Sequence, residues 1–304
     1  MLTRDAEAFL AFARGCAADF GPATARAAFL VSPEGFQRAE QSAQDNRYMA
    51  AAERFDVDAA LAEHRQLQAA LSQDVPVIAF AGDAATPDAV FPNNVFATST
   101  GKLIVGRMRH PIRQREALRS DIRRHFTDVM GYAEVDLSQQ PHPCELTGSL
   151  VIDRARGLGY CGLSERCDEA GAALMHQAFG LRATLMFPLA AGEYHTNVLL
   201  AVLAGRAALI CPAGFADSRI PAAIADLYGE HAVALNVNEQ AAFAGNAIAL
   251  SEDRVWMSLA AAQALTDAHR RQLQDGAGFA IGSVPLDAIE RGGGSLRCCV
   301  AEIF

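Results

Sequence analysis

Cys298 has the most distinctive surroundings of any residue in this chain, because it lies in the C-terminal stretch RGGGSLRCCVAEIF, residues 291–304. The three glycines at 292–294 lack a Cβ and let a backbone approach another group closely. Arg297 precedes the thiol, and a neighbouring cation favours the thiolate, which is the nucleophilic form of cysteine. The same residues also fit a glycine-rich turn before a buried strand, with cysteines as small apolar residues. Cys298 is therefore a candidate nucleophile, and residues elsewhere in the chain are needed to distinguish this role from that of a buried structural cysteine.

Other stretches place a histidine or a carboxylate a few residues before a small polar residue that begins an apolar stretch, which is the position that Cys298 also occupies. His195 lies two residues before Asn197, and Glu145 lies four residues before Ser149. Asp88 lies six residues before Asn94. A thiolate, a histidine that moves protons and a carboxylate that binds or orients are the parts of covalent acyl or amidino transfer. Taken singly, His195 also fits a turn histidine, and Glu145 a surface or capping residue. Their recurrence at one phase of a repeat favours the catalytic interpretation.

The repeat has a period of about fifty residues. A small polar residue precedes an apolar stretch at five positions, which are separated by 55, 48, 49 and 52 residues: Asn94, Ser149, Asn197, Asn246 and Cys298. Turn residues and a second apolar strand follow the first four, at 102–105, 159–161, 207–211 and 254–257. Helical patterns come next, at 114–125, 167–179, 221–228 and 259–274. The predicted unit is strand, turn, strand, helix, strand, used about five times.

The segment at 27–31 is an apolar strand without a partner of its own. We expect it to pair with the last unit and close a ring, because closure removes exposed sheet edges. A closed ring of five α/β units brings the five small polar residues to one central mouth, although they are far apart in the sequence.

Composition limits the classes of partner. The net charge of −9 argues against a nucleic-acid partner, which needs a basic face. The longest apolar run, 198–204, is too short to span a bilayer, so no membrane partner is expected. Seven irregularly spaced cysteines without a secretory leader indicate a reduced, cytoplasmic protein. Cys161 and Cys167 lack a matching CxxC or HxxxH pair, so no metal is expected.

The 304 residues are interpreted as a single catalytic domain with an N-terminal helical extension over 1–20. Alanine, phenylalanine and leucine recur at helical spacing in that extension, which favours packing against the ring over a contact with a partner. The sequence does not select an assembly, and a homodimer is the candidate kept open.

Five short stretches, in this order from about residue 75 to the C-terminus, resemble the guanidine-modifying (pentein) superfamily. They are FPNN (91–94), ELTGS (145–149), YHTN (194–197), FAGN (243–246) and GGSLRC (293–298). That superfamily includes arginine deiminases, dimethylargininases and amidinotransferases, and this chain most resembles the citrulline-utilisation hydrolase type. The resemblance implies a five-bladed α/β propeller (pentein fold), with ββαβ repeats around a central active-site mouth and no cofactor.

The resemblance also implies roles for single residues. Cys298 resembles the nucleophile, His195 the general acid and base, and Glu145 the carboxylate that binds the guanidino nitrogens. Asp88 matches a position that contacts the guanidino or amino end of the substrate. Arg166 resembles an arginine that binds the substrate α-carboxylate, a task that suits its planar fork.

Three positions leave the substrate open. Arg113 aligns loosely with a second carboxylate-binding arginine and fits a solvated charge at a helix start equally well. Asn94 and Asn197 stand where arginine deiminases have aspartates, and an amide keeps hydrogen-bonding geometry but removes charge. A neutral ureido group or a substituted guanidine therefore suits this pocket better than free arginine.

The expected function is a cysteine-dependent hydrolase of a guanidino or ureido group in an arginine-related small molecule. Cys298 attacks the ζ-carbon, Glu145 and Asn94 hold the tetrahedral adduct, and a thiouronium intermediate is released by water that His195 activates. The alternatives are an amidinotransferase and a non-catalytic binding protein on the same fold.

Overall fold

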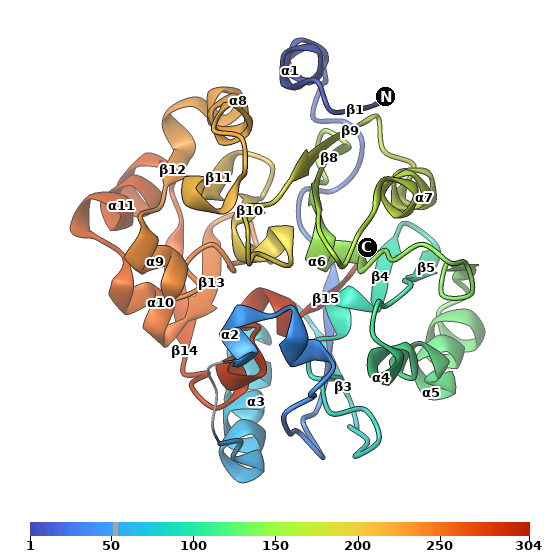
Figure 1. Ribbon diagram of the computed structural model, residues 1–304. Helices are drawn as coiled ribbons and strands as arrows, with labels where there is room; N and C mark the ends of the chain where they lie inside the picture. The colour runs from blue at the N-terminus through green and yellow to red at the C-terminus, as the bar shows by residue number, and fades with distance from the viewer. Residues whose placement is uncertain (51–53) are drawn as a thin grey trace.

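The computed structural model describes residues 1–50 and 54–304, and within them five sheets lie around a common centre (Figure 1). Three of them share one design, an antiparallel hairpin followed by a parallel strand. Their strands are β4 Phe96–Ser99, β5 Lys102–Val105 and β6 Ala133–Asp136; β7 Leu150–Asp153, β8 Leu158–Leu163 and β9 Ala183–Pro188; and β10 Leu200–Leu203, β11 Ala207–Ile210 and β12 Ala232–Ala234. The predicted second strands of these units are confirmed.

The N-terminal strand β2 (Ala27–Val31) pairs antiparallel with the last strand β15 (Ala301–Ile303), as predicted. On its other side β2 pairs parallel with β3 (Val77–Phe80). Segments from the two ends of the chain therefore build one sheet of the same design.

The remaining sheet differs from the prediction. It contains β13 (Arg254–Ser258) and β14 (Ala280–Val284) in parallel, without a full hairpin partner. A strand was expected after Asn246, but in the described residues only Ile248 pairs there, exchanging two backbone hydrogen bonds of 3.0 and 2.8 Å with Trp256. This unit is consequently the least regular of the five.

Most helices lie on the outside of the sheets, whereas α2 (Arg47–Ala50) and α6 (Leu146–Ser149) lie near the centre (Figure 1). The longer ones are α1 Ala6–Arg14, α3 Val57–Leu71, α7 Glu169–Phe179 and α8 Arg219–Tyr228. The shorter ones are α2 Arg47–Ala50, α4 Pro111–Gln114, α5 Ser120–Arg124, α6 Leu146–Ser149, α9 Val237–Ala241, α10 Leu259–Ala264 and α11 Asp267–Arg271. The helix at 167–179 is confirmed as α7, and the one at 221–228 as the body of α8.

Two predicted helices are interrupted. The helix expected at 114–125 is divided into α4, a 3-10 turn and α5, because Arg119 takes an extended backbone with ψ 93°. The helix expected at 259–274 ends at Leu265, whose ψ is 130°. Thr266 then caps α11 by accepting a hydrogen bond from the backbone N–H of His269. Apolar residues recur at helical spacing in both stretches, but extended residues and a cap break each helix into shorter ones.

Residues 1–20 form a short strand and a helix that pack onto the second sheet. β1 (Leu2–Thr3) pairs parallel with β9, and Asp5 caps α1. Phe9 is buried, with its ring 5.6 Å from that of Tyr160. No helix in the described part of the chain is both long and apolar enough to cross a bilayer.

The repeated polar residues lie in helical turns before the hairpins rather than on strands. Asn94 ends the 3-10 turn η2 (Pro92–Asn94), Ser149 ends α6, and Asn197 lies in η5 (Thr196–Val198). Cys298 lies in η10 (Leu296–Cys299), whereas Asn246 lies in an irregular loop. One helical turn therefore presents each of four side chains to the centre.

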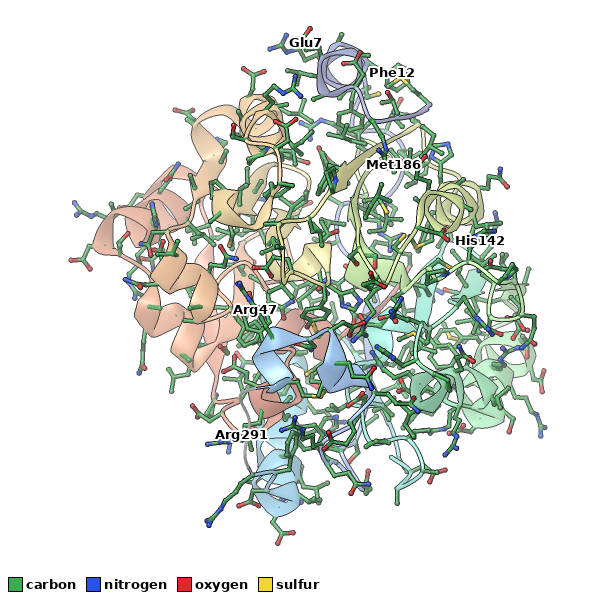
Figure 2. The ribbon with its side chains drawn as sticks, in the orientation of Figure 1. Glu7, Phe12, Arg47, His142, Met186 and Arg291 are labelled. Carbon is green, nitrogen blue, oxygen red and sulfur yellow. The ribbon has the colours of Figure 1, made fainter. Side chains whose placement is uncertain are left out.

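We predict that Phe29→Ala lowers the free energy of unfolding by about 3–5 kcal/mol. Phe29 is fully buried in β2, and its ring lies 5.6, 6.3 and 5.4 Å from those of Phe80, Phe96 and Phe126. Phe12 is the control, because it is 43% exposed on α1 at the rim of the molecule (Figure 2). Phe12→Ala should cost about 0.5 kcal/mol or less in denaturant titrations. Equal losses in the two variants would contradict this packing.

Candidate active site

The glycines before Cys298 are needed for close packing. Gly293 has a φ of 77°, and a Cβ there would lie 2.4 Å from the amide nitrogen of Asn46. A Cβ on Gly294 would lie 2.9 Å from the ring of Phe91 and 3.1 Å from the Cβ of Cys298. The three glycines thus allow the loop to pass between the nucleophile candidate and its neighbours.

Two amides surround the sulfur of Cys298. Asn246 donates from Nδ2 to Sγ at 3.3 Å, and Asn197 has its Nδ2 at 3.6 Å and its Oδ1 at 3.8 Å from the same atom. The side chain is buried, with 1% of its surface exposed. Asn197, predicted to bind substrate, therefore contacts the nucleophile candidate directly.

Arg297 favours the thiolate of Cys298, as predicted, but burial of the thiol has the larger effect. Burial raises the pKa of the Cys298 thiol above its ordinary value, and Arg297 together with the amide donors lowers it by less. Arg297 directs its guanidinium to Glu302 at 2.8 Å and to the carbonyl of Val300 at 2.7 Å. The resting thiol is therefore protonated, and proton removal has to accompany attack.

His195 and Glu145 form a fully buried pair. His195 Nε2–H donates to Glu145 Oε2 at 2.8 Å, since a carboxylate only accepts, and this leaves Nδ1 as an acceptor. That Nδ1 has no hydrogen-bond partner among the described residues. Burial lowers the pKa of His195 and Glu145 opposes that shift, so the resting imidazole is neutral. A neutral imidazole with a free acceptor nitrogen can take a proton.

Three groups donate hydrogen bonds to the buried carboxylate of Glu145, and one of them, Arg166, is a cation. Besides His195, Arg166 donates from Nη1 to Oε2 at 3.1 Å, and the backbone N–H of Arg109 donates to Oε1 at 3.0 Å. Burial alone would raise the pKa of Glu145, but Arg166 and His195 hold it well below its usual range. The carboxylate is thus ionised and fixed behind the imidazole. Direct contact between Glu145 and guanidino nitrogens stays a prediction.

Asn94 and His195 lie against the same glycine. A Cβ on Gly148 would lie 2.4 Å from Asn94 Oδ1 and 2.8 Å from His195 Nδ1. Asn94 Oδ1 is also buried without a partner in the described residues. The motif ELTGS therefore needs its glycine, because any side chain there would fill the space between the amide and the imidazole.

Asp88 and Arg113 are both buried beside these groups. Asp88 Oδ2 accepts a hydrogen bond from Ser42 at 2.5 Å, while its Oδ1 has no partner among the described residues. Burial raises the pKa of Asp88, and Arg113 opposes this shift. Arg113 is not a solvated charge at a helix start, because its fork binds Glu116 at 2.9 and 2.8 Å inside the protein. Burial raises the pKa of Glu116 to about 7.

Arg166 is brought to the site, but its fork holds carboxylates of the chain itself. It donates to Asp45 from Nη2 at 2.5 Å and from Nε at 3.0 Å, in addition to the bond with Glu145. His110 Nε2 lies 3.0 Å from the same aspartate. Despite partial burial, which acts to raise it, hydrogen bonds from His110 and Arg166 lower the pKa of Asp45 to about 2. Binding of a substrate carboxylate by Arg166 or Arg113 stays a prediction.

Asp88, Asn94 and the two arginines line a small pocket of about 10 Å³, with room for about one water molecule. Segment 42–49 covers it and contributes Ser42, Asn46 and Met49. Arg47, at the start of α2 near the centre of the view in Figure 2, pairs with the buried Glu193. The rest of the lining comprises Asp88, Phe91, Asn94, Arg113, Arg166, Tyr194, Gly292 and Gly294.

Sequence reasoning missed the contribution of segment 42–49 to the site. Asp45 bonds to Arg166 across 121 positions, so no local pattern connects the two residues. The one available signal is the run of polar residues at 40–47, interrupted only by Ala43, which is too long for an ordinary tight turn. Within the described residues, no group of three or more His, Cys, Asp or Glu side chains is placed to hold a metal ion.

We predict that Arg166→Met lowers the free energy of unfolding by about 3–5 kcal/mol, because it leaves Glu145 buried without its main counter-charge. Arg4→Met is the matched control. Arg4 pairs with Glu169 at 2.5 Å, but the two side chains are 55% and 61% exposed. Its loss should cost less than about 1 kcal/mol. Urea titrations measure both values. Equal stability of the two variants would contradict a stabilising role for the hydrogen bonds around Glu145.

Solved structures share this fold. The N-terminal domain of ArgZ, an arginine dihydrolase from the ornithine–ammonia cycle in cyanobacteria, matches with a TM-score of 0.79 at 18% identity, over 91% of this chain and 97% of that one. Unliganded AgrE matches with a TM-score of 0.79 at 21% identity, over 91% of this chain and 39% of that one. A dimethylarginine dimethylaminohydrolase, solved as an adduct with 4-chloro-2-hydroxymethylpyridine, matches with a TM-score of 0.69 at 18% identity, over 92% of this chain and 100% of that one.

No curated protein matches the chain in a sequence comparison. The family described as N,N dimethylarginine dimethylhydrolase, eukaryotic, matches residues 32–304, nearly the whole chain. The predicted resemblance to the guanidine-modifying superfamily is thereby confirmed, and the α/β fold is that of the pentein enzymes. The chain belongs to the N,N dimethylarginine dimethylhydrolase family, within the pentein superfamily.

Proposed function

We propose that this protein is a cysteine-dependent hydrolase that cleaves a C–N bond in the guanidino or ureido group of an arginine-related amino acid. The five sheets would form the blades of one α/β propeller, with residues 1–304 as a single catalytic domain. The pairing of β2 with β15 supports this ring, because it joins the two ends of the chain in one sheet. Seven free cysteines fit a reducing compartment such as the cytoplasm.

The observation that carries the proposal is a set of buried acceptor atoms without partners in the described residues. They are Asp88 Oδ1, Asn94 Oδ1 and His195 Nδ1. Asp88 and Asn94 line the pocket, and His195 lies next to Asn94 across Gly148. Buried acceptors are costly to leave unpaired. A planar group with several N–H donors, such as a guanidinium or a urea, offers partners to such acceptors, and the pocket would have to widen from its present volume of about 10 Å³ to admit it.

The arrangement supports a two-step covalent mechanism. Sγ of Cys298 bonds to the ζ-carbon as its proton passes to Nδ1 of His195, and the C–N bond of the leaving amine breaks as that amine takes the proton from His195. The S–C bond then holds a thiouronium intermediate when the substrate is a guanidine, or a thiocarbamate when it is a urea. His195 Nδ1 removes a proton from water, the resulting hydroxide bonds to the same carbon, and the S–C bond breaks as the sulfur of Cys298 takes that proton back from His195. Glu145 orients the imidazole and stabilises its charged form, as an acceptor on Nε2–H.

The charges around the pocket support a head group of low net charge. Burial raises the pKa of Asp88 and brings that of Glu116 to about 7, and the guanidinium of Arg113 lies 4.0 Å from Asp88 and 2.8 Å from Glu116, where it balances their negative charge. Asn94 adds a neutral amide at the position where arginine deiminases have an aspartate. A ureido group offers N–H donors without a full positive charge. We therefore propose that ureido or substituted guanidino amino acids are better substrates than free arginine.

Labelling with a haloacetamidine tests the nucleophile. The reagent carries an amidine that the acceptor atoms can bind, so it should alkylate Cys298 selectively among the seven cysteines, as located by peptide mass spectrometry. His195→Ala should slow this labelling by roughly tenfold or more, because it removes the proton acceptor. Cys298→Ser is the control and should abolish the mass increase. Absence of label on Cys298, or equal rates with and without His195, would contradict the catalytic assignment.

A substrate panel tests the reaction. Arginine, methylarginines, succinylarginine, agmatine and citrulline are assayed for ammonia or amine release, and ornithine-dependent product formation would instead indicate an amidinotransferase. Turnover of none of them would overturn the hydrolase proposal.

The role of Asn94 in substrate choice is tested on the same panel. Asn94→Asp should raise kcat/KM for arginine relative to citrulline by roughly tenfold, because a carboxylate adds a charge-assisted hydrogen bond to the guanidinium. Asn93→Asp is the matched control, since it adds the same charge one residue away. An unchanged arginine-to-citrulline ratio in Asn94→Asp would remove Asn94 from the account of specificity.

A further inference from the structure

Asn246 contacts Cys298 at two points, although the mechanism above gives this asparagine no role. Its Oδ1 accepts a hydrogen bond from the backbone N–H of Cys298 at 3.3 Å. Its Nδ2 donates to the carbonyl of Asn197 at 2.7 Å and to the sulfur of Cys298 at 3.3 Å. A backbone N–H only donates and a carbonyl only accepts, so the amide orientation is fixed at both ends. Asn246 therefore presents a donor, and never an acceptor, to the sulfur.

Asn197 differs from Asn246 in this respect. Its Nδ2 and Oδ1 lie 3.6 and 3.8 Å from the sulfur, at nearly the same distance. The Oδ1 can accept from a thiol, and the Nδ2 can donate to a thiolate. Asn197 thus accommodates both protonation forms, whereas Asn246 favours the thiolate.

The loop that carries Asn246 is strained, which is a second and independent observation. Phe243 has a φ of 61°, a left-handed conformation that costs free energy for a bulky residue. A Cβ on Gly245 would lie 2.6 Å from the carbonyl oxygen of Val198 and 2.9 Å from the sulfur of Cys211. Phe243 therefore holds an unfavourable backbone conformation, and the packing at Gly245 leaves no space for a side chain. Strain of this kind persists where the surrounding structure imposes it, and it is concentrated at functional sites.

We propose that Asn246 is a positioning residue that grips the nucleophile, directing the sulfur of Cys298 and stabilising its thiolate with a fixed amide donor. The strained loop 243–246 delivers this amide. A role for Asn246 in catalysis rests on the proposed function. Its effect on the reactivity of the Cys298 thiol can be measured without turnover.

Few charged or titratable groups face the sulfur. Arg297 lies beside it in η10 and favours the thiolate, while Cys299 and Tyr194 interact with it only when they are themselves ionised. Tyr194 is buried and its pKa is raised well above the ordinary value, so it stays neutral. A backbone hydrogen bond from Ser295 also favours the thiolate, and Asn246 is the side chain that favours it most.

The test is the pH dependence of Cys298 alkylation by iodoacetamide, located on its peptide by mass spectrometry. Asn246→Ala removes the donor, and Asn246→Asp keeps an acceptor for the N–H of Cys298 but replaces the donor with a carboxylate. Both should move the midpoint of the rate profile to higher pH and slow alkylation at neutral pH by roughly tenfold or more, with the Asp variant affected more. The plateau rate at high pH should stay near that of the unsubstituted protein.

Ser149→Ala is the matched control, because Ser149 is the buried equivalent position of the second unit and its hydroxyl has no hydrogen-bond partner among the described residues. Its midpoint should not move. A purely structural role for Asn246 would lower thermal stability and the plateau rate without moving the midpoint, and that result would overturn the proposal. If the midpoint moves but no compound in the substrate panel turns over, the grip stands and the hydrolase proposal fails.

Discussion

The candidate site depends on one buried negative charge, the carboxylate of Glu145. A carboxylate without access to solvent is stable only when nearby donors and cations replace its hydration. Arg166, His195 and the backbone N–H of Arg109 do so here. These partners come from distant parts of the chain, so satisfying the charge brings their loops into contact. Arg166 is in turn held by Asp45, which extends the same electrostatic requirement to the segment that covers the pocket.

The polar groups around the centre divide into two sets with opposite hydrogen-bonding character. Around the sulfur of Cys298 the structure supplies amide donors, which suit a thiolate. Around the pocket it leaves acceptors without partners in the described residues, on Asp88, Asn94 and His195, which suit an N–H-rich group. A nucleophile stabilised by donors next to a recess lined by acceptors is what attack on a guanidino or ureido carbon requires. This complementarity supports the proposed chemistry more strongly than any residue alone.

The sequence predicts the strands and the convergent residues better than their contacts. Strands 27–31 and 102–105 have the predicted bounds, because short apolar runs flanked by turn residues specify them locally. The repeat also identifies which residues approach the centre, and Asn197 does contact Cys298 across 101 positions. Periodicity does not indicate which side-chain atoms contact one another. It therefore does not predict the pairing of Arg113 with Glu116 or the hydrogen bonds between Asn246 and Cys298. The breaks at Arg119 and Leu265 depend on single backbone conformations, to which hydrophobic periodicity is insensitive.

The central claim is that Cys298 bonds covalently to the substrate carbon during turnover. The most direct measurement is peptide mass spectrometry of protein mixed with a substrate from the panel and quenched in acid within the first turnovers. The account predicts a transient mass increase, equal to the substrate less its leaving amine, on the peptide that contains Cys298, and neither adduct nor turnover in Cys298→Ser. Turnover that persists in Cys298→Ser, or that proceeds without an adduct at any quench time, would contradict it.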